Sequence, residues 1–562
     1  MKKIFTLVII LLLLNVWARA QHKKYIVSFI DKKGTAHTLS NPSTYLSARA
    51  IERRIRQKLP IDSTDLPVSK AYLDSVRQFA SVQLVHTSKW LNQALISTDD
   101  GWAVERIKNF PFVKSVRLVS QAPMARRRTD KRTKGWELLP EGRVQQTDET
   151  NTISYGNTYN QIHLHKGEYL HDLGFTGRGI SIAVLDAGFN AYKTNPAFDS
   201  VRLDGRILGE WDFVENNASV NEDHFHGANC LSIMAANRPG VIVGSAPHAS
   251  YWLLRTEDAF SETLQEEVNW ATAAEFADSA GADIISSSLG YIDFDDPADD
   301  HSYAERDGKT TLITRAANMA ARKGMIVVNS AGNNGMQMSD MRFVGCPADG
   351  DSVLAVGGTD GFGNLYLSGS WGPNSAGRVK PNVVSVAQGT VFANALGNAA
   401  AGNGTSYACP NMAGLIACLW QAFPEFTNME IIDYVQRASD LADAPNERMG
   451  YGIPNFELAY QLLFEERERR GQNSIPGNKW IKAYPNPSPG DFKVVIKAPN
   501  TGKGSLQLID MMGRIIESKT LEVTSGQLYF IHFSNKHAWA RGLYYVRYAD
   551  GKTRETIPLI RQ

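Results

Sequence analysis

Three short segments carry the residue types of nucleophilic catalysis. An apolar run from Ile180 to Leu185 ends in Asp186, a His-Gly pair begins at His226, and a glycine-rich loop precedes Ser406. A serine becomes a nucleophile when an imidazole takes its proton and a carboxylate orients that imidazole. Each segment alone also has a structural explanation, as a turn acid, a surface histidine or a helix cap. Together they indicate an acid, a base and a nucleophile.

The second segment holds two histidines, and the sequence favours His226 over His224 as the base. Gly227 follows His226 and lets other backbone, or a substrate, approach the imidazole closely. His224 is then expected to be a surface histidine or one that supports the site. A zinc site built from this pair would need ligands spaced as in HExxH, and the sequence has none.

The segment from Gly402 to Gly414 is the most specific of the three. Its glycines allow a tight loop, and Ser406 would then stand at a helix start, where backbone N–H groups favour developing negative charge. The alternative is that Thr405 or Ser406 only caps that helix.

In the order Asp, His, Ser, the three segments resemble the subtilisin-like serine peptidases, whose nucleophile motif has the form Gly-Thr-Ser-x-Ala-x-Pro. Chymotrypsin-like enzymes run His, Asp, Ser and α/β-hydrolases run Ser, acid, His, so only the subtilisin order fits among these three. The resemblance implies a secreted serine endopeptidase with Asp186, His226 and Ser406 as its triad and an acyl-enzyme that water hydrolyses. Its substrates would be proteins or peptides. This chemistry requires no cofactor, and no metal ligand is assigned.

Two further segments match the same family. Asn329 to Gly335 resembles its oxyanion loop, so Asn333 would donate its side-chain amide to the oxyanion together with the Ser406 backbone N–H. A neighbouring apolar run resembles the strand that pairs with the substrate backbone. The residues expected to contact substrate are Ser288, Leu289, Gly290, Ala331 and Gly332.

The chain departs from the commonest family pattern at Ala228, Tyr407 and Asn411, where Thr, Met and His are usual. None is a triad residue, so the departures concern the pocket walls more than the chemistry. The main alternative, a catalytically inactive homologue that binds peptides at the cell surface, would need a broken triad or oxyanion loop. An adhesin is a weaker alternative, and an esterase shares the chemistry and stays open.

The elements that must position these residues form an α/β domain over residues 151–465. Apolar runs alternate with helical stretches, which predicts a doubly wound, mostly parallel, subtilisin-like sheet with helices on both faces. Catalytic residues of such sheets lie at the carboxyl ends of strands and on adjoining helices. The predicted strands are Ile180 to Leu185, Tyr251 to Arg255, Ile284 to Ser288, Met325 to Asn329 and Val353 to Val356.

A small α+β module is predicted over residues 21–120. Its strands are expected at 25–30, 82–85 and 113–118, and its helices at 45–58 and 102–109. In size and position it resembles the inhibitory propeptide of subtilisin-like enzymes, which implies a zymogen whose own propeptide is a partner. A basic linker at 121–150 predicts a processing site between about Pro123 and Thr150.

After a second linker at 466–480, residues 481–562 alternate as the strands of a small β-sandwich. The segments Tyr484 to Gly490, Leu506 to Arg514 and Gly542 to Val546 resemble the sorting domain of the type IX secretion system. This implies a Gram-negative bacterium of the Bacteroidetes type, the secretion machinery as a partner, and passage through the periplasm to the cell surface or medium. A carbohydrate-binding or stalk β-sandwich is the alternative.

Residues 1–20 have the pattern of an export signal, with two lysines, an apolar run and an Ala-Arg-Ala cleavage site. No later segment reaches about 18 apolar residues, so we expect no membrane span after the signal is removed. Lysine plus arginine (59) balances aspartate plus glutamate (58), which leaves no global field to attract nucleic acid.

Four cysteines could form two disulfides. Cys409 and Cys418 are expected on one helix, about 13 Å apart, which is too far to bridge, so we expect mostly buried thiols. Structural calcium is common in the resembled family, but acidic runs such as Asp293 to Asp300 assign no ligands. Side-chain preference and the physiological substrate depend on loops whose shape the sequence does not show.

Overall fold

The computed structural model describes residues 23–120, 137–138, 152–473, 479–484, 486–488, 490–533 and 539–561. The chain divides into two compact units, Met1–Tyr460 and Gln461–Gln562. The predicted signal peptide at 1–20 and nearly all of the predicted processing linker at 121–150 lie outside the described residues.

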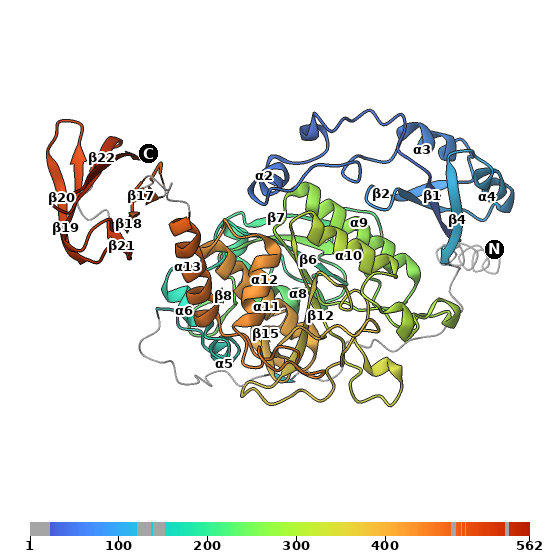
Figure 1. Cartoon of the computed structure of the whole chain (residues 1–562). Helices are drawn as coiled ribbons and strands as arrows, with labels where there is room; N and C mark the ends of the chain where they lie inside the picture. Colours follow the sequence, from blue (N-terminus) through green and yellow to red (C-terminus); the bar gives the residue numbers. More distant parts are fainter. Residues whose placement is uncertain are drawn as a thin grey trace, which may run out of the picture. The chain divides into compact units, whose positions relative to one another are not determined.

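A seven-stranded parallel sheet forms the centre of the first unit (Figure 1), as the alternating pattern predicts. Its strand order is β14-β13-β12-β11-β6-β10-β7. Five strands coincide with predicted runs, whereas β7, a half-buried edge strand, and β14, only four residues long, were not predicted. The strands are β6 (Ser181–Asp186), β7 (Ile207–Asp212), β10 (Ser250–Arg255), β11 (Ile284–Ser287), β12 (Ile326–Ser330), β13 (Val353–Thr359) and β14 (Val383–Val386).

Helices cover both faces of this sheet, which confirms the predicted fold class. Ala183, Leu185 and Ile285 point to one face and share a core with α9 and α10, while α8 and α11 pack on the other face. Because both faces are buried, the strands are apolar almost throughout. The helices are α8 (His226–Ala235), α9 (Leu264–Ala280), α10 (Leu312–Arg322) and α11 (Thr405–Ala422).

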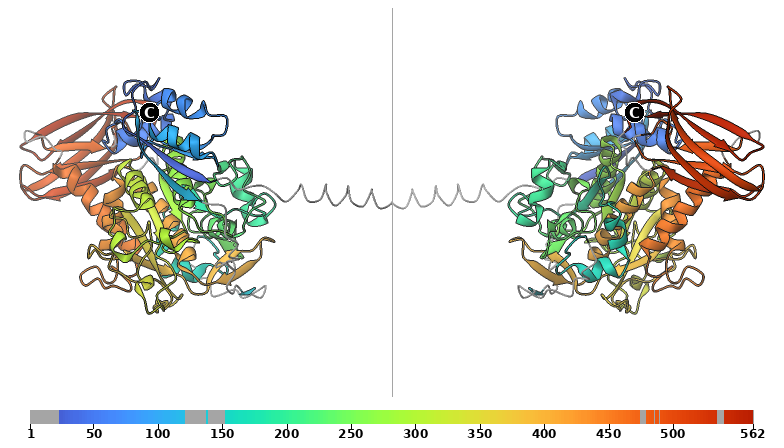
Figure 2. Two further views of the ribbon diagram at one scale, coloured as in Figure 1. Left: turned by 90° about the vertical axis from the view of Figure 1, so that its right-hand side faces the viewer. Right: turned by 90° about the vertical axis from the view of Figure 1, so that its left-hand side faces the viewer.

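Residues 23–120 form the predicted α+β module, with a four-stranded antiparallel sheet of order β2-β3-β1-β4. The module lies against the peptidase-like part, as the blue and green segments of Figures 1 and 2 show. The short elements β3 and α3 were not predicted. The elements are β1 (Lys24–Phe29), α2 (Ala48–Arg56), α3 (Lys70–Arg77), β2 (Gln83–Ser88), β3 (Gln93–Ser97), α4 (Gly101–Lys108) and β4 (Val113–Ser120).

A buried lysine holds the turn that leads into β13. Lys380 Nζ donates to the carbonyls of Gly350 (2.8 Å) and Val353 (2.7 Å) and to Asn382 Oδ1 (3.0 Å). Burial lowers the pKa of Lys380 to about 7. Three acceptors nevertheless require three N–H hydrogens, which only the ammonium form supplies. Below about pH 7, the turn is therefore held by a cation that the chain itself provides.

The four cysteines, all within the described residues, are buried free thiols, which confirms the expectation from their spacing. Cys409 and Cys418 both lie in α11.

The second unit begins within helix α13 (Phe456–Asn473), so residues 466–473, predicted as linker, are helical. Two antiparallel sheets follow, of order β17-β18-β21 and β20-β19-β22-β23. Phe492 and Val494 of one sheet share a core with Leu506 and Val546 of the other, as in the predicted sandwich. The strands are β17 (Ile481–Tyr484), β18 (Phe492–Lys497), β19 (Gly502–Asp510), β20 (Ile515–Val523), β21 (Leu528–Phe533), β22 (Gly542–Ala549) and β23 (Arg554–Arg561).

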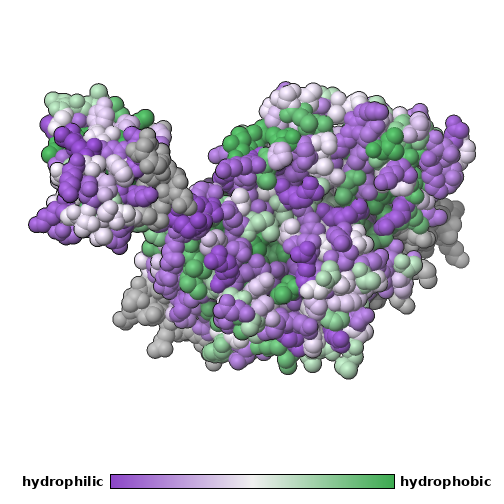
Figure 3. All heavy atoms as spheres, viewed as in Figure 1, coloured by the Kyte–Doolittle hydropathy of each residue, from purple (hydrophilic) through white to green (hydrophobic). Residues whose placement is uncertain are grey.

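Hydrophilic residues predominate on the face shown in Figure 3, and hydrophobic atoms appear there only in small groups. Among the described residues, no helix combines the length and the apolarity needed to cross a bilayer.

Candidate active site

Asp186 ends β6, the strand that lies between β10 and β11. Its side chain is fully buried, and the backbone N–H of Ala187 donates to Oδ1 at 2.7 Å. Strands β11 and β12 run parallel to β6, so all three end at the same edge of the sheet. The loops after Asp186, Ser287 and Ser330 therefore gather at one place.

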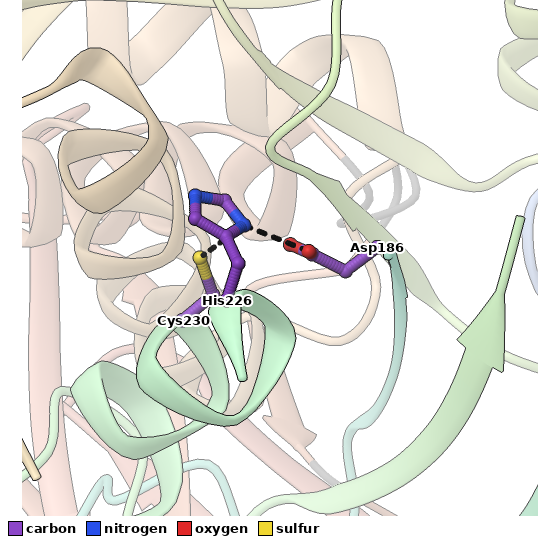
Figure 4. Close-up of side chains that lie close together, drawn as sticks. All are labelled: Asp186, His226 and Cys230. Atoms are coloured by element: carbon purple, nitrogen blue, oxygen red, sulfur yellow. Dashed lines mark hydrogen bonds and ion pairs between the residues drawn. The ribbon is translucent and has the colours of Figure 1, made fainter. Parts of the chain in front are cut away.

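His226 begins α8, and its Nδ1 lies 2.7 Å from Oδ1 of Asp186 (Figure 4). Two glycines allow this approach. A Cβ on Gly227 would lie 2.4 Å from the carbonyl oxygen of Gly188, and a Cβ on Gly188 would lie 2.4 Å from the backbone nitrogen of His224. His224 Nδ1 instead accepts from the His226 backbone N–H at 3.2 Å. The structure thus brings His226 to the carboxylate and places His224 beside the helix start.

Ser406 is the second residue of α11, and its Oγ donates weakly to the Ser288 carbonyl at 3.4 Å. Pro410, four residues later, has no N–H, so the Ser406 carbonyl lacks the usual donor within the helix. The Ser288 hydroxyl donates to that carbonyl at 2.7 Å, and the Cys230 thiol donates at 3.4 Å. The helix start that carries Ser406 is therefore tied to the end of β11.

Asn333 lies in the loop after β12, and its Oδ1 accepts from the Thr405 backbone N–H at 2.9 Å. Because the amide oxygen is used in this way, the amide nitrogen is the group that remains to donate. The position that a Cβ would take on Gly404 lies 3.7 Å from Asn333 Nδ2 and 3.8 Å from the Ser406 backbone nitrogen. The two donors predicted for the oxyanion therefore border one space that the glycine leaves open.

The residues expected to contact substrate come from two neighbouring strand ends. After β11, the Leu289 side chain is buried and its carbonyl accepts from Asn329 Nδ2 at 2.8 Å, whereas Gly290 is exposed. After β12, Ala331 is buried and Gly332, at φ 106°, accepts from the Thr405 hydroxyl at 3.2 Å. These two segments approach the start of α11 through Ser288 and Asn333.

For two of the residues that depart from the family pattern, Tyr407 and Asn411, the structure shows defined contacts. The Tyr407 ring stacks 5.9 Å from the His226 ring, so it forms a wall beside the proposed base. Asn411 Nδ2 donates to the Gln161 carbonyl (2.8 Å) and to Ser385 Oγ (3.1 Å), which makes it a structural residue of α11.

Cys230 completes a buried group with Asp186 and His226 whose potential ligand atoms lie within 4.8 Å of one another (Figure 4). A metal would require the Cys230 thiolate, but burial raises the pKa of this thiol well above its usual value. The 2.7 Å separation of His226 and Asp186 is that of a hydrogen bond. The group therefore fits an acid–base pair packed on a thiol better than a metal centre.

Cys230 is one of the four cysteines expected to be mostly buried, and its contacts with the site were not predicted from the sequence. Its spacing of four residues from His226 is the signal that places both side chains on one face of a helix.

Comparison with known families matches all three parts of the chain. Residues 177–452 match the subtilase family, residues 24–134 match the peptidase S8 propeptide domain of Bacteroidota, and residues 482–562 match the secretion system C-terminal sorting domain.

Individual relatives agree with the first match. Over 292 residues, 51% of this chain, the sequence is 31% identical to a thermophilic serine proteinase of Bacillus sp. (strain AK1). It is 27% identical to subtilisin BL of Lederbergia lenta over the same length, and 28% identical over 288 residues to alkaline elastase YaB of Bacillus sp. (strain YaB). The matched part spans 63%, 93% and 66% of these three proteins, so it covers less than two thirds of the first and third.

Proposed function

Residues 177–452 are a domain of the subtilase family, and from this premise we propose that the protein is a secreted serine endopeptidase with Asp186, His226 and Ser406 as its triad. The observation that carries the proposal is the 2.7 Å hydrogen bond between a fully buried strand-end carboxylate and an imidazole at a helix start. Because Nδ1 is engaged by Asp186, Nε2 is the ring nitrogen that takes the serine proton.

In the proposed reaction, Ser406 Oγ attacks a peptide carbonyl while His226 takes its proton. For this proton transfer the Ser406 hydroxyl must turn from the Ser288 carbonyl towards His226. The 3.4 Å hydrogen bond from Oγ to that carbonyl is weak and opposes the rotation only slightly. The oxyanion accepts from the Ser406 backbone N–H and from Asn333 Nδ2. His226 then protonates the leaving amine, and water hydrolyses the acyl-enzyme with the imidazole again acting as base.

The flanking domains place this chemistry outside the cell. The C-terminal sorting domain marks the chain for secretion or attachment at the cell surface. We further propose that the propeptide domain keeps the enzyme silent until the chain is cut between residues 121 and 150, and that the type IX machinery recognises the sorting domain.

The test compares the wild-type protein with Ser406→Ala for hydrolysis of denatured casein and for labelling by a fluorophosphonate probe. Ser525→Ala, an exposed serine of the second unit, is the matched control. We expect Ser406→Ala to lose both signals and Ser525→Ala to keep them. Labelling that survives in Ser406→Ala would overturn the nucleophile assignment. A processed wild-type protein that neither cleaves casein nor takes the probe would favour the inactive, peptide-binding homologue.

A further inference from the structure

Titratable side chains from three elements surround the imidazole of His226. Asp186 of β6 lies 2.7 Å from Nδ1, and the Cys230 thiol of α8 lies 3.9 Å from the same nitrogen (Figure 4). The ring of His224, just before α8, is centred 6.4 Å from the His226 ring. Tyr407 of α11 is the fourth group, and the proposed reaction gives it no role.

Tyr407 belongs to a stack of three rings. Its ring is centred 5.9 Å from the His226 ring, with 29° between the two planes. The same ring is centred 5.0 Å from that of Phe392, again at 29°. Both separations are those of interacting aromatic pairs. Phe392 lies in β15 (Thr390–Ala393) and is 1% exposed, and Tyr407 is 5% exposed. A buried neighbour therefore fixes the Tyr407 ring against the imidazole.

A glycine of the nucleophile segment leaves room for this stack. Gly402 ends β16 (Ala399–Gly402), which pairs with β15. A Cβ on Gly402 would lie 2.9 Å from Cε2 of Tyr407 and 3.0 Å from Cε1 of Phe392. The Tyr407 backbone N–H also donates to the Gly404 carbonyl at 3.0 Å. Both the ring and the backbone of Tyr407 are thus held in place.

The stack has a chemical effect because the charge of His226 changes in the proposed reaction. The face of an aromatic ring attracts a cation whose centre lies within about 6 Å, and more strongly where water is excluded. His226 is 3% exposed, so water screens its charge little. Burial raises the pKa of Tyr407, and its phenol is therefore uncharged at neutral pH. The ring thus favours the imidazolium form of His226 without a counter-charge of its own.

We propose that Tyr407 is a positioning residue of the proposed triad: supported by Phe392, its ring fixes the plane of the His226 imidazole and stabilises the imidazolium. In the first step the proton of Ser406 Oγ passes to His226 Nε2 while Oγ bonds to the substrate carbonyl carbon. The stack favours the charged product of that transfer. Methionine, the commonest family residue at this position, has no ring to do so. The inference rests on the proposed function and adds to it a residue that acts through the base.

Kinetics of the processed enzyme on a peptide substrate between about pH 5 and about pH 9 test this role. Tyr407→Leu removes the ring and should lower kcat about 5- to 30-fold while KM changes less than about twofold. The acidic limb of the kcat/KM profile should move to lower pH by about 0.5–1 unit, because the imidazolium loses a stabilising contact. Tyr407→Phe keeps the ring and should retain both the rate and the profile.

Tyr434→Leu is the matched control, because Tyr434 is also a buried tyrosine packed on an aromatic ring. It is 8% exposed, and its ring lies 6.1 Å from that of Phe426, beyond the end of α11 that is distant from Ser406. Its substitution should leave the rate and the profile unchanged. If Tyr407→Leu does not fold, Gly402→Ala pushes a Cβ against the ring and should shift both in the same direction by a smaller amount.

A second measurement does not depend on peptidase activity. NMR of the histidine-labelled Ser406→Ala protein follows the ring nitrogens of His226 across the same pH range, and Tyr407→Leu should lower the midpoint of that titration by about 0.5–1 pH unit. An unchanged midpoint and profile in a folded Tyr407→Leu protein, or a lower kcat with neither shift, would overturn the positioning role. A shifted midpoint in a protein whose wild type cleaves no peptide would support the stack and overturn the proposed function alone.

Discussion

In the proposed triad, the 2.7 Å bond between Asp186 and His226 would hold Nδ1 of the imidazole in the donor role and leave Nε2 as the base. Asp186→Asn would keep the size of the side chain but favour the wrong tautomer. We expect kcat on a peptide substrate to fall about 10⁴-fold with little change in KM. Asp204→Asn, at an exposed position before β7, should retain wild-type kinetics. A loss of less than tenfold in Asp186→Asn would contradict the assigned role.

A substitution of Asn333 tests whether the space beside Gly404 holds the oxyanion in the proposed reaction. Asn333→Ala removes the amide donor and should lower kcat by about 10²–10³, whereas KM should stay nearly constant because the bond forms mainly in the transition state. Asn334→Ala in the same loop is the control and should cost less than about tenfold. A change confined to KM in Asn333→Ala would show that the residue binds ground-state substrate instead.

At this scale, residue type and chain order were sufficient to predict that Asp186 ends a strand and that His226 and Ser406 stand at helix starts. Those placements are confirmed. The effect of Pro410 could not be predicted in the same way. The missing N–H is evident from the residue type, but the hydroxyl of Ser288 replaces it from another strand end, and only the folded chain shows that partner.

Among the elements, the junction between β6 and α8 depends on a glycine contact. Gly227→Ala would place a Cβ 2.4 Å from the Gly188 carbonyl oxygen and 2.9 Å from the Asp186 Cβ. Alanine is the better helix former by about 1 kcal/mol, but the overlap should outweigh this and lower the free energy of unfolding by about 1–3 kcal/mol. Urea unfolding of the Ser406→Ala protein with and without Gly227→Ala measures the effect. Gly101→Ala, which meets nothing within 4 Å, should be neutral or stabilising.

Two buried histidines near the start of the peptidase domain make it sensitive to acid. His165 lies between α5 (Tyr159–His163) and α6 (Gly167–Asp172), and it contacts the Pro454 carbonyl (3.0 Å) and Ser385 Oγ (2.8 Å). Burial lowers the pKa of His165 to about 4, and that of His171 likewise. Below pH 6.5 the unfolded chain therefore binds more protons than the folded one, so stability is lost as the pH falls towards 4.

We expect each of these histidines to cost about 3 kcal/mol of unfolding free energy between about pH 7 and pH 4. Urea unfolding of the Ser406→Ala protein across this range should show the loss, and His165→Gln should make the pH dependence less steep. His532→Gln, at an exposed site of the second unit, should leave it unchanged. An equally steep dependence in His165→Gln would contradict the assignment.

The sequence predicted elements well where the burial pattern is uniform. Strands β6, β10, β11, β12 and β13 are buried almost throughout and therefore appear as apolar runs. Strand β7 lies at the sheet edge and is only partly buried along most of its length. Strands β3, β14 and β17 are four or five residues long. Their patterns are therefore too short or too mixed to recognise. Helix α13 extended past the predicted boundary because its charged residues, such as Glu466 and Arg470, form ion pairs along its surface.

At the scale of the whole molecule, three families match successive parts of the chain, so we expect export to be separable from the proposed catalysis. Deleting residues 480–562 should leave active enzyme in the periplasm, because the sorting domain is lost while the residues of the proposed site remain. Immunoblots and casein hydrolysis of periplasmic and medium fractions measure this. Ser525→Ala should be exported as the wild type is, and unchanged secretion of the truncated chain would count against the proposed recognition.

The order of the parts was predicted from the sequence because each has its own periodicity, but the contact between α2 and α9 was not. The arginines of α2 lie on the helix predicted at 45–58, but their partner Asp278 lies more than two hundred residues later in the chain. Charge complementarity over such a separation is visible only in the folded chain.

The ammonium of Lys380 affects how the turn before β13 responds to the composition of the medium outside the cell. A turn held by a dissolved ion loosens when that ion is diluted or sequestered, whereas this one is held by a side chain that cannot diffuse away. The entry to β13 should therefore keep its geometry in media poor in minerals and in the presence of chelators. In this part of the fold, a side chain of the protein itself supplies the positive charge that binds the oxygen atoms of the turn.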